Sequence, residues 1–158
     1  MKESNQFVVF KLDEKQYALH PFAVERVVAA VEITQLPKAP EIVHGVINIQ
    51  GRVIPVINIR KRFRLPEHEI DLNDRLIIAK TTRRTVALVV DAVIGIVKRS
   101  EQEFIMADKV IPGTDYIEGL IKLEGGIILI PDLDKFLSLE EEVKLDVAVK
   151  KRKQHNRK

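Results

Sequence analysis

The stretch GVINIQGRVIPVINIRKRF, at residues 45–63, is followed 74 residues later by a similar one, GLIKLEGGIILIPDLDKFL, at residues 119–137. The two stretches align without a gap and are identical at five of nineteen positions, where ordinary composition would give roughly one or two. In each, a β-branched run ends at a Gly and a second run follows, which is the pattern of a hairpin. A repeated hairpin therefore decides how this chain folds.

A second pair of similar stretches precedes the first pair. Residues 7–28 align with residues 76–97 at an offset of 69, with six identical positions. Two repeats in the same order favour internal duplication over chance similarity among strands rich in Ile and Val. We therefore predict two similar units, at about residues 7–66 and 74–138, that are either consecutive or interleaved.

The content of each unit follows from short β-branched runs between turn residues. They predict strands at residues 7–11, 16–19, 24–34, 46–49, 53–57, 75–80, 85–90, 92–99, 116–123 and 127–130. Asn58 and Asp132 each precede a short apolar run and are predicted N-caps of short helices. About five strands per unit predict an all-β fold in which each unit closes as a barrel and the two barrels share an interface.

Charge is concentrated at the C-terminal end of the chain. The formal net charge is +3, but six Lys and Arg residues and no acid lie in the last nine positions, which leaves 20 basic and 23 acidic residues elsewhere. We predict one domain over residues 6–139 and a charged, disordered tail over residues 140–158. No apolar run approaches the ~20 residues of a membrane-spanning helix, so we expect a cytoplasmic protein.

The residue types that enzymes use do not converge in this sequence. There is no Cys, the four His are isolated, and the three Ser lie outside any nucleophile or phosphate-loop motif. Asp132 and Asp134 form a pair that helix capping explains, because Asp132 aligns with Asn58. Asp91 lies in an apolar run and needs a cation, for which Arg75 or Lys80 is a candidate. We predict no catalytic residue, no metal and no cofactor.

Residues 45–60, GVINIQGRVIPVINIR, resemble the most distinctive stretch of the CheW-like chemotaxis coupling proteins, where Gly-x-x-Asn-x-Arg-Gly leads into Pro-Val-Ile-Asp-Leu-Arg. The opening hairpin, residues 24–28 and VALVVDAV at residues 86–93 also resemble this family, so the resemblance covers residues 6–139. It implies two similar five-stranded, SH3-like β-barrel subdomains, in agreement with the repeat. It also implies a non-catalytic adaptor that couples methyl-accepting chemoreceptors to a CheA-type histidine kinase and reaches the membrane only through the receptors.

The family's binding surfaces carry over to particular residues. The resemblance implies that the receptor's cytoplasmic tip lies in a groove between the barrels, against Val24, Asn48, Gln50, Gly51, Val90 and Val93. It implies a kinase-facing side at Pro21 and Arg26. From the residues themselves, Gly51 suits a tight turn because Gly adopts positive φ. Asn48 either contacts the receptor or satisfies its own turn.

Two positions depart from the family's pattern. Gln50 stands where the family usually has Arg, and Arg26 stands where some relatives have an acidic residue. An amide does not bind a carboxylate bidentately as a guanidinium does, so these changes indicate a different set of partners or a specialised second copy of the adaptor.

Two alternatives remain open from the sequence. One is a CheW-like scaffold of another histidine-kinase pathway, and the other, from a different class, is a small β-barrel nucleic-acid binder that uses the basic tail. The tail has no aromatic residue for base stacking, so we expect no nucleic-acid partner.

Overall fold

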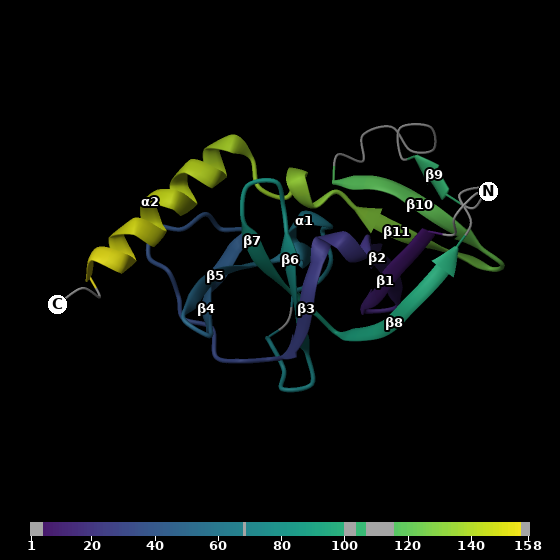
Figure 1. Cartoon of the computed structure of the whole chain (residues 1–158), viewed down its shortest axis with the longest axis horizontal. Coiled ribbons are helices and arrows are strands. Elements are labelled where there is room, and N and C mark those ends of the chain that lie inside the picture. The colour runs from purple at the N-terminus through teal and green to yellow at the C-terminus, as the bar shows by residue number, and fades with distance from the viewer. Residues whose placement is uncertain (1–4, 68, 100–103, 107–115, 156–158) are drawn as a thin grey trace.

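The computed structural model describes residues 5–67, 69–99, 104–106 and 116–155. It contains two β-sheets and one longer helix at the C-terminal end (Figure 1). The strands are β1 (Asn5–Leu12), β2 (Lys15–Leu19), β3 (Val24–Ala29), β4 (Val43–Ile49), β5 (Arg52–Ile57), β6 (Arg75–Lys80), β7 (Thr85–Val90), β8 (Ala92–Arg99), β9 (Phe104–Met106), β10 (Ile117–Leu123) and β11 (Gly126–Pro131). The helices are η1 (Pro21–Ala23), α1 (Ile59–Arg62), η4 (Leu133–Lys135) and α2 (Leu139–His155).

The two sheets have the same topology. Their strand orders are β8-β1-β2-β11-β10-β9 and β3-β6-β7-β5-β4. The repeat makes β6 and β7 equivalent to β1 and β2, β3 equivalent to β8, and β4 and β5 equivalent to β10 and β11. With these equivalences the second order becomes β8-β1-β2-β11-β10, so β9 is the only addition among the described strands.

The sheets are interleaved along the chain. The hairpin β1–β2 of the first repeat joins the strands of the second, and β6–β7 of the second repeat joins β3, β4 and β5. The consecutive boundaries 7–66 and 74–138 are therefore wrong, because one sheet is built within residues 24–90. Similar hairpins fit either sheet locally, and only long-range pairing decides which sheet each one joins.

Four β-bulges fall at equivalent positions of the repeat. Glu25 is skipped in the pairing of β3 with β6, and Ile94 in the pairing of β8 with β1. His44 is skipped between β4 and β5, and Glu118 between β10 and β11. Because bulges bend a strand and increase its twist, their repetition bends the two sheets in the same way.

The predicted strand at residues 24–34 is interrupted after Ala29. Thr34 then exchanges backbone hydrogen bonds of 2.9 and 2.8 Å with Val46 of β4. This bridge brings the chain that leaves β3 back to β4 at the other edge of the sheet, so the sheet closes as a barrel.

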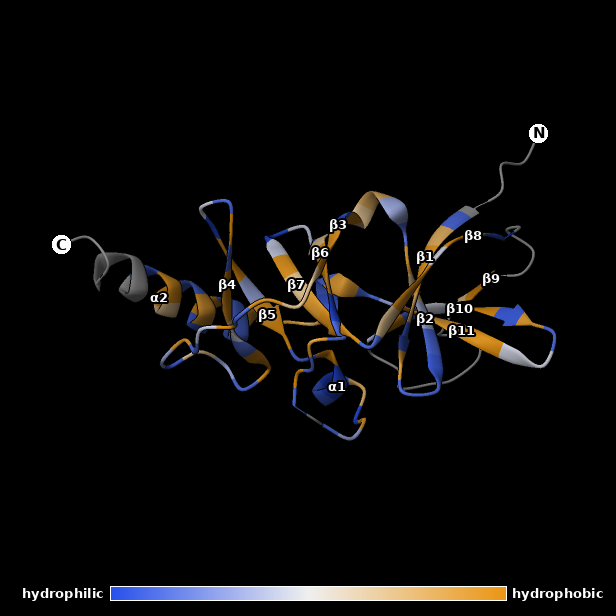
Figure 2. Ribbon diagram, turned by 90° about the horizontal axis from the view of Figure 1, so that it is seen from below, coloured by the Kyte–Doolittle hydropathy of each residue, from blue (hydrophilic) through white to orange (hydrophobic). Residues whose placement is uncertain are grey.

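Buried side chains form three clusters, and apolar residues concentrate on the strands of both sheets (Figure 2). One cluster fills each barrel: Phe7, Val9, Ala18, Ile121, Ile128 and Ile130 in the first, and Ile47, Ile54, Val56, Leu76, Ile78 and Ala87 in the second. The largest lies between them and includes Leu12, Tyr17, Leu88 and Val90. The barrels thus share an interface, as the small size of each unit requires.

Residues Leu139–His155 form the helix α2, where a disordered tail was predicted for residues 140–158; the last three of these lie outside the described residues. Ser138 Oγ accepts a hydrogen bond from the backbone N of Glu141 at 3.1 Å, and Glu141 Oε1 accepts one from the backbone N of Ser138 at 2.8 Å. This reciprocal arrangement is a capping box, which starts a helix. Leu145 and Ala148, three residues apart, are buried in the inter-barrel cluster.

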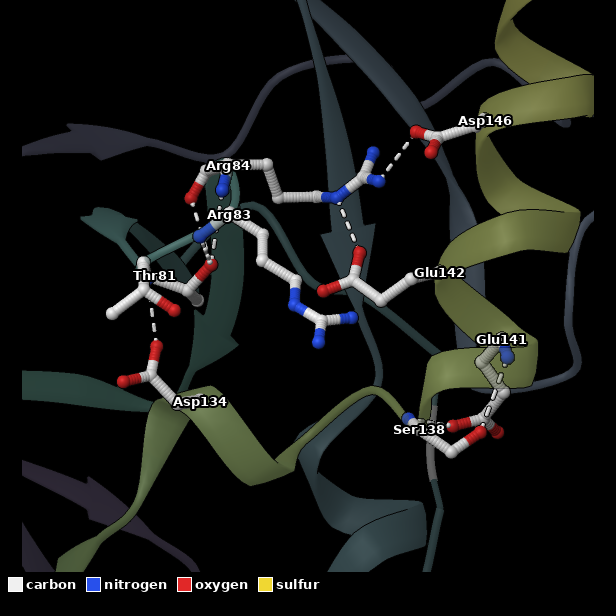
Figure 3. A network of polar contacts seen from close by, with 9 residues as sticks. Thr81, Arg83, Arg84, Asp134, Ser138, Glu141, Glu142 and Asp146 are labelled. Carbon is white, nitrogen blue, oxygen red and sulfur yellow. Dashed lines mark hydrogen bonds and ion pairs between the residues drawn. The ribbon is translucent and has the colours of Figure 1, made fainter.

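Ion pairs also hold α2 to the body of the protein (Figure 3). Arg84 Nε lies 2.6 Å from Glu142 Oε1, and Arg84 Nη2 lies 2.5 Å from Asp146 Oδ1. Arg62 forms an ion pair with Glu141. In both overall views α2 lies beside β4 and β5, at the end of the molecule away from β9, β10 and β11 (Figures 1 and 2). Within the described residues, no helix has the length and apolar character to cross a membrane.

Candidate protein interface

The loop between β4 and β5 consists of Gln50 and Gly51, with φ of 52° and 84°. Positive φ at both positions is typical of a type I′ turn, which fits the twist of a two-residue hairpin. The Gly was expected, whereas Gln rarely adopts this conformation. Asn48 Oδ1 accepts a hydrogen bond from the backbone N of Gly51 at 2.9 Å. Asn48 therefore satisfies its own turn, one of the two readings that the sequence left open.

The two departures from the family's pattern meet in space. Arg26 Nη2, on β3, donates a hydrogen bond to Gln50 Oε1 at 3.2 Å. The oxygens of Asn48 and Gln50 are thus engaged within the protein. Their amide nitrogens have no hydrogen-bond partner among the described residues, so they present donors to a partner.

An ion pair extends this polar surface along β3 and β5. Arg52 Nη1 lies 2.6 Å from Glu25 Oε2, and Arg52 Nη2 donates to Thr85 Oγ1 at 3.2 Å. The hydrogen bond from Arg52 is the main cause that lowers the pKa of Glu25 below its usual value. We call Glu25, Arg26, Gln50 and Arg52 the hairpin surface.

Apolar groups lie on β3 and β8. Val24 and Val93, which the repeat makes equivalent, are both half-buried against the inter-barrel cluster. On the same two strands Val27, Ile94 and Ile96 are 39%, 50% and 66% exposed. Exposed apolar side chains beside polar ones suit a protein partner.

Two of the predicted contact residues lie elsewhere. Val90 is fully buried in the inter-barrel cluster, so its side chain is a core residue and is not exposed for the receptor contact that the resemblance implies. Alternation along β7 explains this burial, because Val86, Leu88 and Val90 point to the same side of the strand. Pro21 is half-buried in η1, just before β3.

The sequence did not reveal the role of Arg60. Its guanidinium is buried and binds Asp91 at 2.7 and 2.8 Å through Nη2, and Asp13 at 3.0 Å through Nη1. Asp91 thus pairs with Arg60 and not with the predicted Arg75 or Lys80. The signal was present, since Arg60 is the last residue of the family-like stretch. Because Asp13 lies in the β1–β2 turn, the network ties the interleaved hairpin to the other barrel.

The two predicted N-caps and the neighbouring Asp134 differ in the contacts that they make. Asn58 caps α1 as predicted, with Oδ1 accepting from the backbone N of Lys61 at 3.2 Å. Asp132 makes no such cap, so that prediction is wrong for η4. Asp134 Oδ1 accepts from the backbone N of Thr82 at 2.7 Å. In the described part of the chain, no group of three His, Asp or Glu residues has the arrangement of a metal site.

A family model described as the CheW-like domain matches residues 6–141, which include both barrels and the hairpin surface. The chain belongs to the CheW-like family. It is 31% identical to the chemotaxis protein CheW of Thermotoga maritima, over 81% of this chain and 84% of that protein. It is 32% identical to the CheW of Bacillus subtilis, over 89% of this chain and 91% of that one.

A solved structure of this family shares the fold. The crystal structure of the scaffolding protein TtCheW from Thermoanaerobacter tengcongensis matches with a TM-score of 0.80 and 32% identity, over 88% of this chain and 96% of that one. The predicted fold class, mostly β with two SH3-like subdomains and few short helices, is confirmed.

Proposed function

We propose that the protein is a non-catalytic adaptor that couples chemoreceptors to a CheA-type histidine kinase in chemotaxis signalling. The observation that carries this proposal is the family match over residues 6–141, which spans both barrels without interruption. The shared core supports the same role, because two barrels packed on one cluster hold separate binding surfaces in a fixed relation.

The receptor surface consists of Val24, Asn48, Gln50, Gly51 and Val93. Its support is the combination of amide donors at the hairpin with apolar groups on β3 and β8, which suits an amphipathic helix laid on the surface. The kinase surface includes Pro21 and Arg26. Arg26 donates a hydrogen bond to Gln50, so the two proposed surfaces adjoin.

A non-catalytic role agrees with the contacts of the acidic side chains. Asp13 and Asp91 bind Arg60, and Asp134 binds a backbone N, so these carboxylates stabilise the fold. The protein acts in the cytoplasm in this proposal, since the receptor tips and the kinase that it joins lie there.

Binding assays with each partner separately test the proposal. Immobilised protein should retain both the regulatory domain of the host's CheA-type kinase and a receptor cytoplasmic fragment. Gly51→Asp should lower receptor retention at least fivefold, because it adds strain and a charge at the hairpin. Gly125→Asp is the matched control: Gly125 has the same φ of 84° but lies on the other barrel. Retention of neither partner, or equal loss in both variants, would contradict the assignment.

A further inference from the structure

The repeat places two pockets of the molecule at equivalent positions, and only one of them is open. The open pocket has a volume of about 380 Å³ and is lined in part by His20, Glu118, Asp132 and Asp134. The closed pocket, with about 20 Å³, is lined by the equivalent residues Val89, His44, Asn58 and Arg60. Equivalent positions of the two barrels thus form one pocket that is nearly filled and one that is open.

The closed pocket is filled by the chain's own connector between α1 and β6. Asn58 Nδ2 donates to Glu67 Oε1 at 2.7 Å, and Arg60 Nη1 donates to the backbone O of Pro66 at 2.9 Å. Ile70 of the connector adds an apolar side chain to the lining. Burial lowers the pKa of His44 and outweighs the opposing effect of Glu67. Nitrogen donors therefore line this pocket, and an acidic segment that places Ile70 in the lining covers it.

The open pocket has the opposite chemistry at each of these positions. Glu118 replaces His44, Asp132 replaces Asn58, and Asp134 replaces Arg60. Three residues with nitrogen donors thus become three carboxylates, which at neutral pH only accept hydrogen bonds. Cationic side chains near the pocket offset the negative charge of these carboxylates only in part.

These nearby cations are Lys80 and Lys135, and His20 adds a hydrogen-bond partner. Lys80 lines the pocket, and Lys135 Nζ lies 4.0 Å from Asp132 Oδ2. His20 Nε2 lies 2.8 Å from Glu118 Oε2. Burial nevertheless raises the pKa of Asp132, so its ionised form is under-solvated.

No segment among the described residues covers this pocket as the connector covers the other. The connector that follows α1 folds back over the closed pocket, whereas the segment that follows η4 begins α2, which packs beside β4 and β5. Phe22 stands at the rim, 83% exposed, with its ring stacked on His20 at 5.0 Å between centroids. Leu19 and Leu133 supply an apolar wall. An exposed aromatic ring beside carboxylates suits a cation with an apolar neighbour.

We propose that the open pocket binds an extended segment of a partner protein in which Lys or Arg residues flank an apolar residue. Such a segment is the charge inverse of the connector that fills the equivalent pocket. The apolar side chain takes the place that Ile70 takes in the closed pocket. The cations pair with Asp132 and Glu118. The pocket contains none of the hairpin-surface residues, so this site goes beyond the adaptor surfaces proposed above and is tested separately from them.

Two synthetic peptides test the proposal with the full chain. One is the connector sequence RLPEHEIDL from residues 64–72, and the other is RLPKHKIKL, in which Lys replaces its three acids. We expect the Lys peptide to bind, more weakly as salt rises, and to shift the NMR signal of the Thr82 amide, which is bonded to Asp134. The connector peptide should bind at least tenfold more weakly. Equal affinities, or a preference for the connector peptide, would overturn the proposal.

Substitutions then locate the site. Asp132→Asn and Glu118→Gln should each weaken the Lys peptide roughly two- to fivefold, the range of a partly exposed charge pair. Glu124→Gln and Glu140→Gln remove exposed acids outside the pocket and should change nothing. The triple variant Glu118→His, Asp132→Asn, Asp134→Arg copies the closed pocket and should reverse the preference toward the connector peptide. Binding of the Lys peptide that is unaffected by Asp132→Asn and Glu118→Gln would place it elsewhere and refute the pocket, even if the triple variant does not fold.

Discussion

Arg26 and Gln50 lie 24 residues apart in the sequence, yet Arg26 Nη2 donates a hydrogen bond to Gln50 Oε1 across 3.2 Å. Both residues depart from the pattern that the resemblance to the CheW-like family implies, which has Arg at position 50 and, in some cases, an acid at position 26. The two departures therefore meet in one contact. An Arg at position 50 would here face a second Arg, which explains why a neutral amide stands there.

This relationship predicts a non-additive pair of substitutions. Gln50→Arg alone should lower the free energy of unfolding by about 0.5–1 kcal/mol, because it places two like charges beside each other at an exposed contact. Arg26→Glu in the same chain should recover this loss by forming an ion pair. Urea unfolding of both single variants and the double variant gives the coupling energy. A double variant whose loss equals the sum of the single losses would show that the two residues do not interact.

The positive φ at Gly51 predicts a second effect on stability. A Cβ at Gly51 meets no atom within 4 Å, so Gly51→Ala costs only backbone strain, about 1 kcal/mol. Gly126→Ala is the matched control, because its Cβ is equally unobstructed and its φ is not positive. Thermal unfolding should separate the two variants, and equal melting temperatures would mean that the turn relaxes without strain.

Substitution of Arg60 should lower the free energy of unfolding more than most other substitutions. Its side chain is 8% exposed, while those of Asp13 and Asp91 are 41% and 29% exposed. Arg60→Ala leaves two carboxylates without their shared cation, and we expect a loss of about 2–3 kcal/mol, less than for a fully buried pair because the carboxylates regain water. Arg84→Ala removes an Arg of similar exposure from a different ion-pair network, at α2. Denaturant unfolding should show the larger loss for Arg60→Ala.

Helix α2 predicts a contrast between two Leu residues of very different exposure. Leu145→Ala removes a fully buried side chain and should cost about 2–3 kcal/mol. Leu139→Ala changes a side chain that is 67% exposed and should cost less than about 0.5 kcal/mol. If both variants unfold at the wild-type urea concentration, α2 does not contribute to the core.

The repeat was readable from the sequence because hairpins depend on local patterns. The match of residues 45–63 with 119–137 predicted equivalent hairpins, and the equivalent bulges at His44 and Glu118 bear this out. Gly51 and Asn58 were likewise predicted from their neighbours alone, one for its turn and the other for its cap.

The remaining features depend on contacts far apart in the chain. Asp91 pairs with Arg60, which lies 31 residues away in the sequence. The cations that the sequence suggested, Arg75 and Lys80, lie closer along the chain. The C-terminal helix was missed because its many charges resembled a disordered tail. Its capping box at Ser138 and the spacing of Leu145 and Ala148 were the local signals that identify it.

The adaptor role itself is tested most directly by the autophosphorylation rate of the CheA-type kinase in a mixture with receptor fragments. Adding this protein should make the rate depend on the receptor and its ligand. Gly51→Asp should abolish that dependence while kinase binding persists, and Gly125→Asp should preserve it. A rate that responds equally to the receptor with and without the protein would contradict the proposed coupling function.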